Sequence, residues 1–66
     1  MQIRVNGEMI ELFEGTTLFQ WLQNQGEERN TLIIEHNGQI ITEERLRDIT
    51  LQDGDELEVF KFVGGG

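Results

Sequence analysis

The chain has 66 residues, enough for one small domain with a thin core, and its lack of cysteine excludes disulfides and thiolate chemistry. Five basic and thirteen acidic side chains give a net charge of −8, which disfavours nucleic acid and anionic membranes as partners and favours a protein with a basic surface. The sequence has no apolar run long enough to span a membrane and no secretory signal, so a cytoplasmic protein is expected.

The first thirteen residues predict a β-hairpin. Ile3 and Val5 alternate with polar residues, which is typical of a half-buried strand. Asn6-Gly7 follows, and this pair is a strong signal for a tight turn because both residues tolerate positive φ. Residues 8–13 alternate again and form the expected return strand.

A short helix is expected after the hairpin. Thr17 is followed three positions later by Gln20, which matches a capping box at a helix start. Leu18 and Leu22 lie at helical spacing and should form the centre of the buried stripe. Gly26 is a suitable residue to end the helix.

The second half of the chain returns to strand patterns. Residues 32–36 alternate, Asn37-Gly38 predicts a second tight turn, and residues 39–41 form a short strand. Residues 42–46 predict a capped single helical turn, and residues 56–63 predict the last strand.

This order predicts an α+β domain in two layers, with a mixed sheet of four to five strands packed on one main helix. The helical crossover allows the first and last strands to lie side by side and parallel at the centre of the sheet.

Several polar residues could be mistaken for a site. A partly buried, hydrogen-bonded His36 at a strand end is expected rather than a metal ligand or general base. Four acidic residues cluster near the last strand: Asp53, Asp55, Glu56 and Glu58. Their spacing does not match an EF-hand loop, so a solvated acidic turn is expected, and no metal site is predicted.

The sequence closes with three glycines, Gly64, Gly65 and Gly66, directly after the last predicted strand. We expect a domain over residues 1–63 and a flexible C-terminal tail over residues 64–66, because ordering glycine costs more backbone entropy than ordering any other residue. Without side chains, this tail can enter a slot in another protein that a Cβ would block. A frayed terminus is the alternative interpretation.

Five segments together give the chain a family resemblance: MQIRVNGE at 1–8, EGTTL at 14–18, NGQII at 37–41, DGD at 53–55 and FVGGG at 62–66. In this order and spacing they resemble the ubiquitin-like sulfur carriers, and the ThiS proteins of thiamin biosynthesis in particular. The resemblance covers the whole chain and implies a β-grasp fold.

The resemblance also implies a chemical role for Gly66. An adenylating enzyme similar to ThiF would use ATP to form an acyl-adenylate at Gly66, and a sulfur-relay protein would convert the adenylate to a thiocarboxylate. The thiocarboxylate would donate its sulfur to a thiazole synthase similar to ThiG. In this scheme the chain is a carrier rather than an enzyme, it binds no cofactor of its own, and Gly64 and Gly65 thread into partner sites.

The residues just before the glycines are candidates for partner docking. Phe60 and Phe62 share one face of the last predicted strand, and Val63 leads into the tail. Aromatic side chains are common anchors at protein interfaces. Internal packing, for example against Met9 or Phe13, is the alternative for the two phenylalanines.

Other functions remain open at this point. A MoaD-like carrier for molybdenum cofactor synthesis or another acceptor would use the same activated C-terminus. A ubiquitin-like modifier would instead join Gly66 to a lysine of a target protein, and a binding module would make no use of the glycines.

Overall fold

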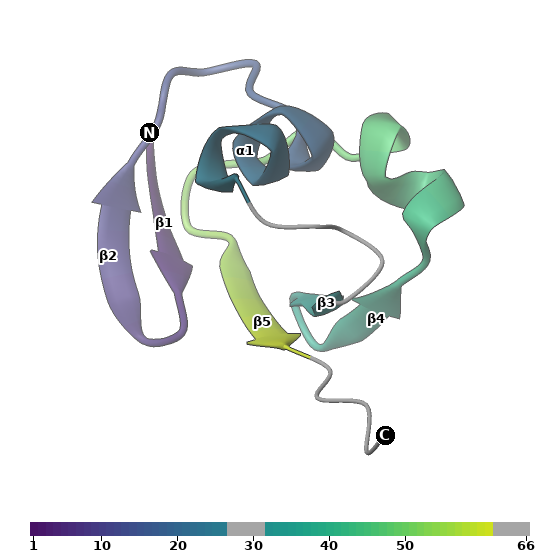
Figure 1. Cartoon of the computed structure of the whole chain (residues 1–66). Coiled ribbons are helices and arrows are strands. Elements are labelled where there is room, and N and C mark those ends of the chain that lie inside the picture. The colour runs from purple at the N-terminus through teal and green to yellow at the C-terminus, as the bar shows by residue number, and fades with distance from the viewer. Residues whose placement is uncertain (27–31, 62–66) are drawn as a thin grey trace.

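The computed structural model describes residues 1–26 and 32–61, and these residues form a five-stranded sheet with a helix across one face (Figure 1). The elements in chain order are β1 (Gln2–Val5), β2 (Glu8–Glu11), α1 (Leu18–Gln25), β3 (Leu32–His36), β4 (Gln39–Ile41), the 3-10 helix η2 (Glu43–Asp48) and β5 (Glu56–Lys61). The predicted α+β class with one main helix is confirmed.

Both predicted hairpins are present, and their turns have nearly the same backbone shape. Asn6 and Gly7 have φ values of 49° and 86°, and Asn37 and Gly38 have values of 50° and 87°. Two successive residues with positive φ define a type I′ turn, whose twist matches that of the flanking strands. The Asn-Gly pairs therefore set the register of β1 with β2 and of β3 with β4.

Helix α1 begins and ends where the sequence predicts. The Gln20 amide N–H donates to Thr17 Oγ1 at 3.1 Å, and the Thr17 amide N–H donates to Gln20 Oε1 at 3.0 Å, so the capping box is complete. Gly26 ends the helix with φ 73°. Leu18 and Leu22 are fully buried against the sheet, as the helical spacing predicts.

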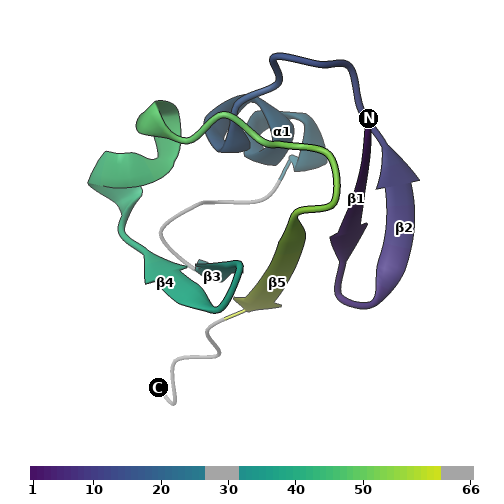
Figure 2. The same cartoon turned by 180° about the vertical axis from the view of Figure 1, so that it is seen from behind.

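The strand order is β2-β1-β5-β3-β4, which places β5 at the centre (Figure 2). Strand β5 runs parallel to β1, with Arg4 opposite Glu56 and Val5 opposite Leu57, and antiparallel to β3. The first and last strands therefore lie side by side and parallel, an arrangement that the helical crossover allows. The outer neighbours, β2 and β4, are joined to β1 and β3 by the two Asn-Gly turns.

The core lies between the inner face of the sheet and α1, and η2 closes one side of it. Its buried hydrophobic members are Ile3, Leu18, Trp21, Leu22, Ile34, Leu46, Leu51 and Leu57. Full burial of one such aliphatic side chain stabilises a fold by about 1.5–3 kcal/mol. The Arg47 guanidinium lies 4.1 Å from the ring centre of Phe19, so a cation–π contact joins η2 to α1.

Two local predictions are corrected. The helical turn expected over residues 42–46 is a longer 3-10 helix, and the Thr42 side chain does not cap it, so the predicted cap is wrong. Strand β2 ends at Glu11 rather than at Phe13, although the Leu12 amide still donates to the Met1 carbonyl at 2.9 Å. The predicted domain boundary at residue 63 and the tail at 64–66 lie outside the described residues.

Candidate functional site

The structure describes only one of the six predicted site residues. Phe60 lies in β5, whereas Phe62, Val63, Gly64, Gly65 and Gly66 lie outside the described residues. The site is therefore built from the strand that precedes the tail, from the groups that hold this strand, and from the surface around Phe60.

The Asn6 side chain holds the second half of β5. Strand pairing between β1 and β5 ends at Val5 and Leu57, where the chain turns back into β2. Beyond that point the Val59 amide donates to Asn6 Oδ1 at 2.8 Å, and Asn6 Nδ2 donates to the Val59 carbonyl at 3.3 Å. One side-chain amide thus supplies the acceptor and donor that a further β1 residue would have provided.

The Asn37 side chain holds the start of β5 from the opposite side. Its Oδ1 accepts a hydrogen bond from the Glu56 amide at 2.9 Å, and its Nδ2 donates to Asp55 Oδ1 at 3.1 Å. The Asn37 backbone amide also donates to the Glu56 carbonyl at 2.8 Å. The asparagine of each hairpin turn therefore fixes one end of β5, a role that the turn prediction did not include.

Asp55 corrects the expected solvated acidic turn, because it is only 8% exposed. Its carboxylate accepts hydrogen bonds from His36 Nε2 at 2.8 Å, the Gln52 amide at 2.9 Å and Asn37 Nδ2 at 3.1 Å. Burial raises the pKa of Asp55, but these hydrogen bonds and the attraction of His36 together hold the pKa below its ordinary value. Asp55 is a structural anchor at the entrance to β5.

The expectations for His36 and for the other three acidic residues of this region are confirmed. His36 is half-buried and hydrogen-bonded at the end of β3. Asp53, Glu56 and Glu58 are exposed, as a solvated acidic turn requires. Among the described residues, no three acidic or histidine side chains are close enough to hold a metal ion.

Phe60 lies on the outer face of the sheet, away from α1. It is 45% exposed, and its partner across the β3–β5 pairing is Ile33, which is 39% exposed. The alternative of packing against Phe13 does not fit, because Phe13 is 91% exposed in the connection after β2. Docking through Phe60 stays a prediction, and this exposure is what an anchor needs.

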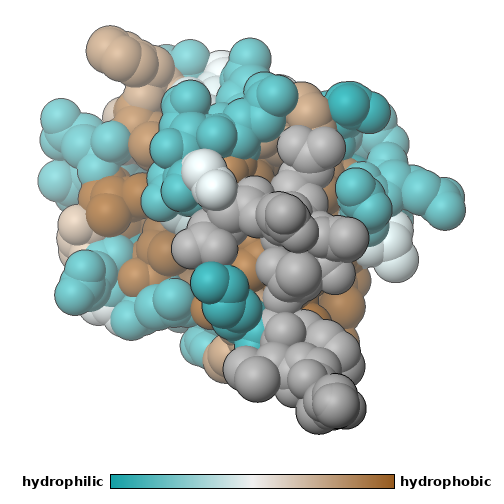
Figure 3. Space-filling view, viewed as in Figure 1, coloured by the Kyte–Doolittle hydropathy of each residue, from teal (hydrophilic) through white to brown (hydrophobic). Residues whose placement is uncertain are grey.

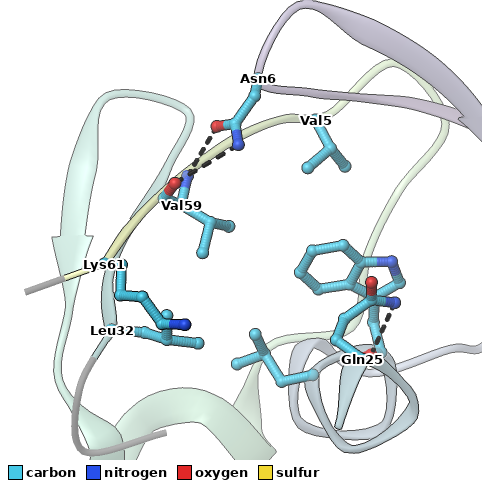
Figure 4. A pocket seen from close by; sticks show the side chains of 8 residues that line it. Val5, Asn6, Gln25, Leu32, Val59 and Lys61 are labelled. Atoms are coloured by element: carbon cyan, nitrogen blue, oxygen red, sulfur yellow. Dashed lines mark hydrogen bonds between the residues drawn. The ribbon is translucent and has the colours of Figure 1, made fainter. Parts of the chain in front are cut away.

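The inner face of the sheet carries a pocket of about 270 Å³ beside the C-terminal end of α1 (Figure 4). Its lining is mainly apolar and includes Val5, Trp21, Leu22, Leu32 and Val59. The two amide side chains in the lining bind the chain's own backbone: Asn6 bonds Val59, and Gln25 donates to the Trp21 carbonyl at 3.4 Å. Lys61 also lines the pocket and is its one charged residue among those described.

Within the described residues, no helix is long and apolar enough to cross a membrane.

Comparisons with known proteins agree with this geometry. Residues 3–66 match the ThiS family. The chain is 34% identical over 65 residues to the sulfur carrier protein ThiS of Bacillus subtilis, covering 97% of this chain and 98% of that protein. The crystal structure of the thiamine biosynthesis protein (ThiS) from Geobacter metallireducens matches with a TM-score of 0.86 and 28% identity over all of both chains.

Two relatives are much longer than this chain. It is 33% identical to a thiazole synthase of Magnetococcus marinus and 29% identical to one of Paramagnetospirillum magneticum, in each case over the whole chain. The chain spans only 20% of the length of each of these proteins. The expected ubiquitin-like β-grasp fold is confirmed by the structural match, and the chain belongs to the ThiS family.

Proposed function

We propose that the chain is a sulfur carrier for thiazole formation in thiamin biosynthesis, and that Gly66 bears the group that carries the sulfur. The observation that carries this proposal is the family match, which extends over residues 3–66 and so includes the three glycines. The relative from Bacillus subtilis, named a sulfur carrier protein, aligns over nearly its whole length.

The chemistry requires activation, because a carboxylate is a poor electrophile. The carboxylate of Gly66 attacks the α-phosphate of ATP, and pyrophosphate leaves. A sulfide equivalent from a relay protein then attacks the acyl carbon, AMP leaves, and a thiocarboxylate remains. The thiocarboxylate sulfur then forms a bond to the thiazole precursor, the bond between the acyl carbon and sulfur breaks, and an oxygen atom from water or from the precursor restores the carboxylate.

The chain acts as a co-substrate in this cycle, and its partners supply the catalytic groups. An adenylating enzyme similar to ThiF consumes the ATP, and a cytoplasmic location follows from that need. A partner similar to ThiG is supported by the two thiazole synthases, because one fifth of each protein aligns with this chain.

The folded body contributes position. Strand β5 is held on both sides by neighbouring strands, and asparagine side chains hold its first residue and Val59 in its second half, so it provides a rigid base for the residues that follow. Holding a reacting group in place lowers the entropic part of a barrier. We assign Gly64 and Gly65 to threading into partner sites, and Phe60, Phe62 and Val63 to docking.

Intact mass spectrometry tests this function. The protein is incubated with ATP, the adenylating enzyme of the same organism and sulfide. The expected product is heavier by the difference between one sulfur and one oxygen atom. A variant extended by one alanine beyond Gly66 is the control and should gain no sulfur while remaining folded.

Other products would change the assignment. Conjugates with other proteins would indicate a ubiquitin-like modifier. A thiocarboxylate that a thiazole synthase does not accept would indicate a carrier for the molybdenum cofactor or another acceptor. An unchanged mass would contradict the carrier proposal.

A further inference from the structure

The outer face of the sheet places two carboxylates directly opposite each other. Glu35 of β3 and Glu58 of β5 are partners in the antiparallel register, and both point away from α1. Side chains at such positions have Cβ atoms about 4.5–5.5 Å apart, and like charges there destabilise a sheet. Within residues 1–26 and 32–61, neither carboxylate forms an ion pair or hydrogen bond, so no direct partner neutralises either charge there.

Exposed apolar side chains surround this acidic pair. Ile40 of β4, which is 69% exposed, lies opposite Glu35 on the same face. Phe60 and Ile33 form the next pair along β5 and β3. Figure 3 shows that hydrophilic residues cover much of the molecular surface from one side, with hydrophobic atoms exposed between them. The five residues Ile33, Glu35, Ile40, Glu58 and Phe60 are called the sheet-face patch below.

We propose that the sheet-face patch binds an arginine side chain of the protein that receives the tail, inside an apolar contact made by Ile33, Ile40 and Phe60. This inference rests on the proposed function and names the chemistry by which a partner is recognised. A guanidinium offers five donors in a planar fork, so one group can bridge both carboxylates. It also stacks on aromatic rings, and Phe60 lies two residues from Glu58 on the same face.

The two carboxylates should be more stable when an arginine side chain bridges them than when they face water in the free protein. The free protein bears the repulsion between Glu35 and Glu58, and a cation placed between them removes it. The partner therefore gains more from this patch than it would from a single carboxylate. The net charge of −8 adds long-range attraction to a basic surface and speeds the encounter.

The proposal predicts opposite effects on stability and on binding. Glu58→Gln removes one charge of the pair without changing its size, so the free protein should unfold at a higher temperature than the wild type. The same change should weaken binding about tenfold or more and reduce the dependence of binding on salt, because a partly buried charge contact is lost. Glu35→Gln should behave in the same way.

Glu11→Gln provides the matched control. Glu11 is exposed on β2, and its cross-strand partner is Gln2. Glu11→Gln therefore removes one negative charge, as Glu58→Gln does, without relieving a like-charge pair. Unfolding is followed by circular dichroism. Binding is measured by isothermal titration calorimetry at two salt concentrations, against the purified thiazole synthase and the purified adenylating enzyme of the same organism.

A loss of affinity for either protein, seen with Glu58→Gln and not with Glu11→Gln, supports the proposal. Equal losses for the two variants, unchanged affinities, or a wild-type protein that binds neither partner would overturn it. The sulfur-transfer assay keeps this test separate from the proposed function. If the Glu58→Gln protein acquires sulfur and binds like the wild type, only the proposed arginine contact is rejected. If Glu58→Gln selectively weakens binding but even the wild type acquires no sulfur, the arginine contact is supported and the proposed function is rejected.

Discussion

The two hairpin turns of this protein share a sequence and a backbone shape, yet their asparagines hold β5 by different means. Asn6 bonds only backbone groups, the amide and carbonyl of Val59, near the end of the strand that leads to the tail. Asn37 bonds the Glu56 amide and the buried Asp55 carboxylate at the start of the strand. The same turn therefore anchors one end of β5 by a neutral contact and the other by a contact that can titrate.

This difference matters for a carrier. The side-chain contact in the second half of β5, between Asn6 and Val59, contains no ionisable group. The ionisable anchor sits at the far end, within a network of His36, Asp55 and Asn37. The predictions below test this division, from the largest expected effect to the smallest.

Loss of the buried carboxylate should have the largest effect. Asp55→Ala leaves three donors without an acceptor, so it should lower the free energy of unfolding by about 3 kcal/mol. Asp53→Ala is the matched control, because Asp53 is exposed and accepts one hydrogen bond, from the Gln2 amide at 2.7 Å. Urea denaturation measures both variants, and equal losses would show that Asp55 is not a special anchor.

Removal of the two turn amides compares the anchors directly. Asn37→Gly and Asn6→Gly both keep a residue that accepts positive φ, so each removes the side-chain bonds without straining the turn. Asn37→Gly should cost about 2 kcal/mol because the buried Asp55 loses a donor, and Asn6→Gly should cost about 1 kcal/mol. Urea denaturation measures both losses, and a larger loss for Asn6→Gly than for Asn37→Gly would contradict the proposed difference between the two anchors.

The acid dependence of stability should separate the two anchors. The folded pKa of Asp55 is lowered below its ordinary value of 3.8, so its contribution is fully present above that value. The contribution should be lost as the pH falls from about 4 through the folded pKa, because the unfolded chain then binds the proton more tightly.

Urea denaturation at a series of pH values between about 2 and 7, a range that brackets the ordinary pKa of an aspartate, measures this loss. Asp55→Asn should reduce the steepness of the acid limb, whereas Asn6→Gly should lower the whole curve and leave its shape unchanged. Identical acid limbs for the wild type and Asp55→Asn would contradict the assignment.

The smallest effect on stability is expected at the end of β5. Phe60→Ser should change the free energy of unfolding by less than about 1 kcal/mol, because the ring is 45% exposed. It should nevertheless weaken binding to the adenylating enzyme or the thiazole synthase. Phe13→Ser is the control, since Phe13 is 91% exposed on another part of the surface, and it should leave binding unchanged. Calorimetric titration of both variants decides the matter.

The sequence predicts what depends on neighbouring residues. The two Asn-Gly turns, the capping box of Thr17 and Gln20, and the buried positions of Leu18 and Leu22 follow from local rules, and all are confirmed. The crossover helix makes the parallel pairing of β1 and β5 possible, but the local sequence does not select it. The predicted capping role of Thr42 is wrong, because its side chain forms no capping hydrogen bond with η2.

Contacts between distant residues were missed. Asn6 and Val59 are 53 positions apart, and nothing in the local sequence joins them. The sequence Asp53-Gly54-Asp55 is typical of a solvated polar turn, and only the folded sheet brings His36 and Asn37 to the Asp55 carboxylate. Of the candidate site, the exposure of Phe60 is described, whereas the roles of Gly64, Gly65 and Gly66 stay predictions.

The central position of β5 also bears on how the domain folds. Strand β5 and the turn before it contact the first hairpin through residues 51 to 53 positions apart, for example the Gln2 amide with the Asp53 carboxylate and Asn6 with Val59. Such pairings form slowly, because a long loop must close before they contribute. During synthesis, β1 and β3 have no shared partner until β5 has left the ribosome. The two hairpins therefore cannot join into one sheet before β5 is available, and a chain that stops before β5 lacks the centre of its sheet.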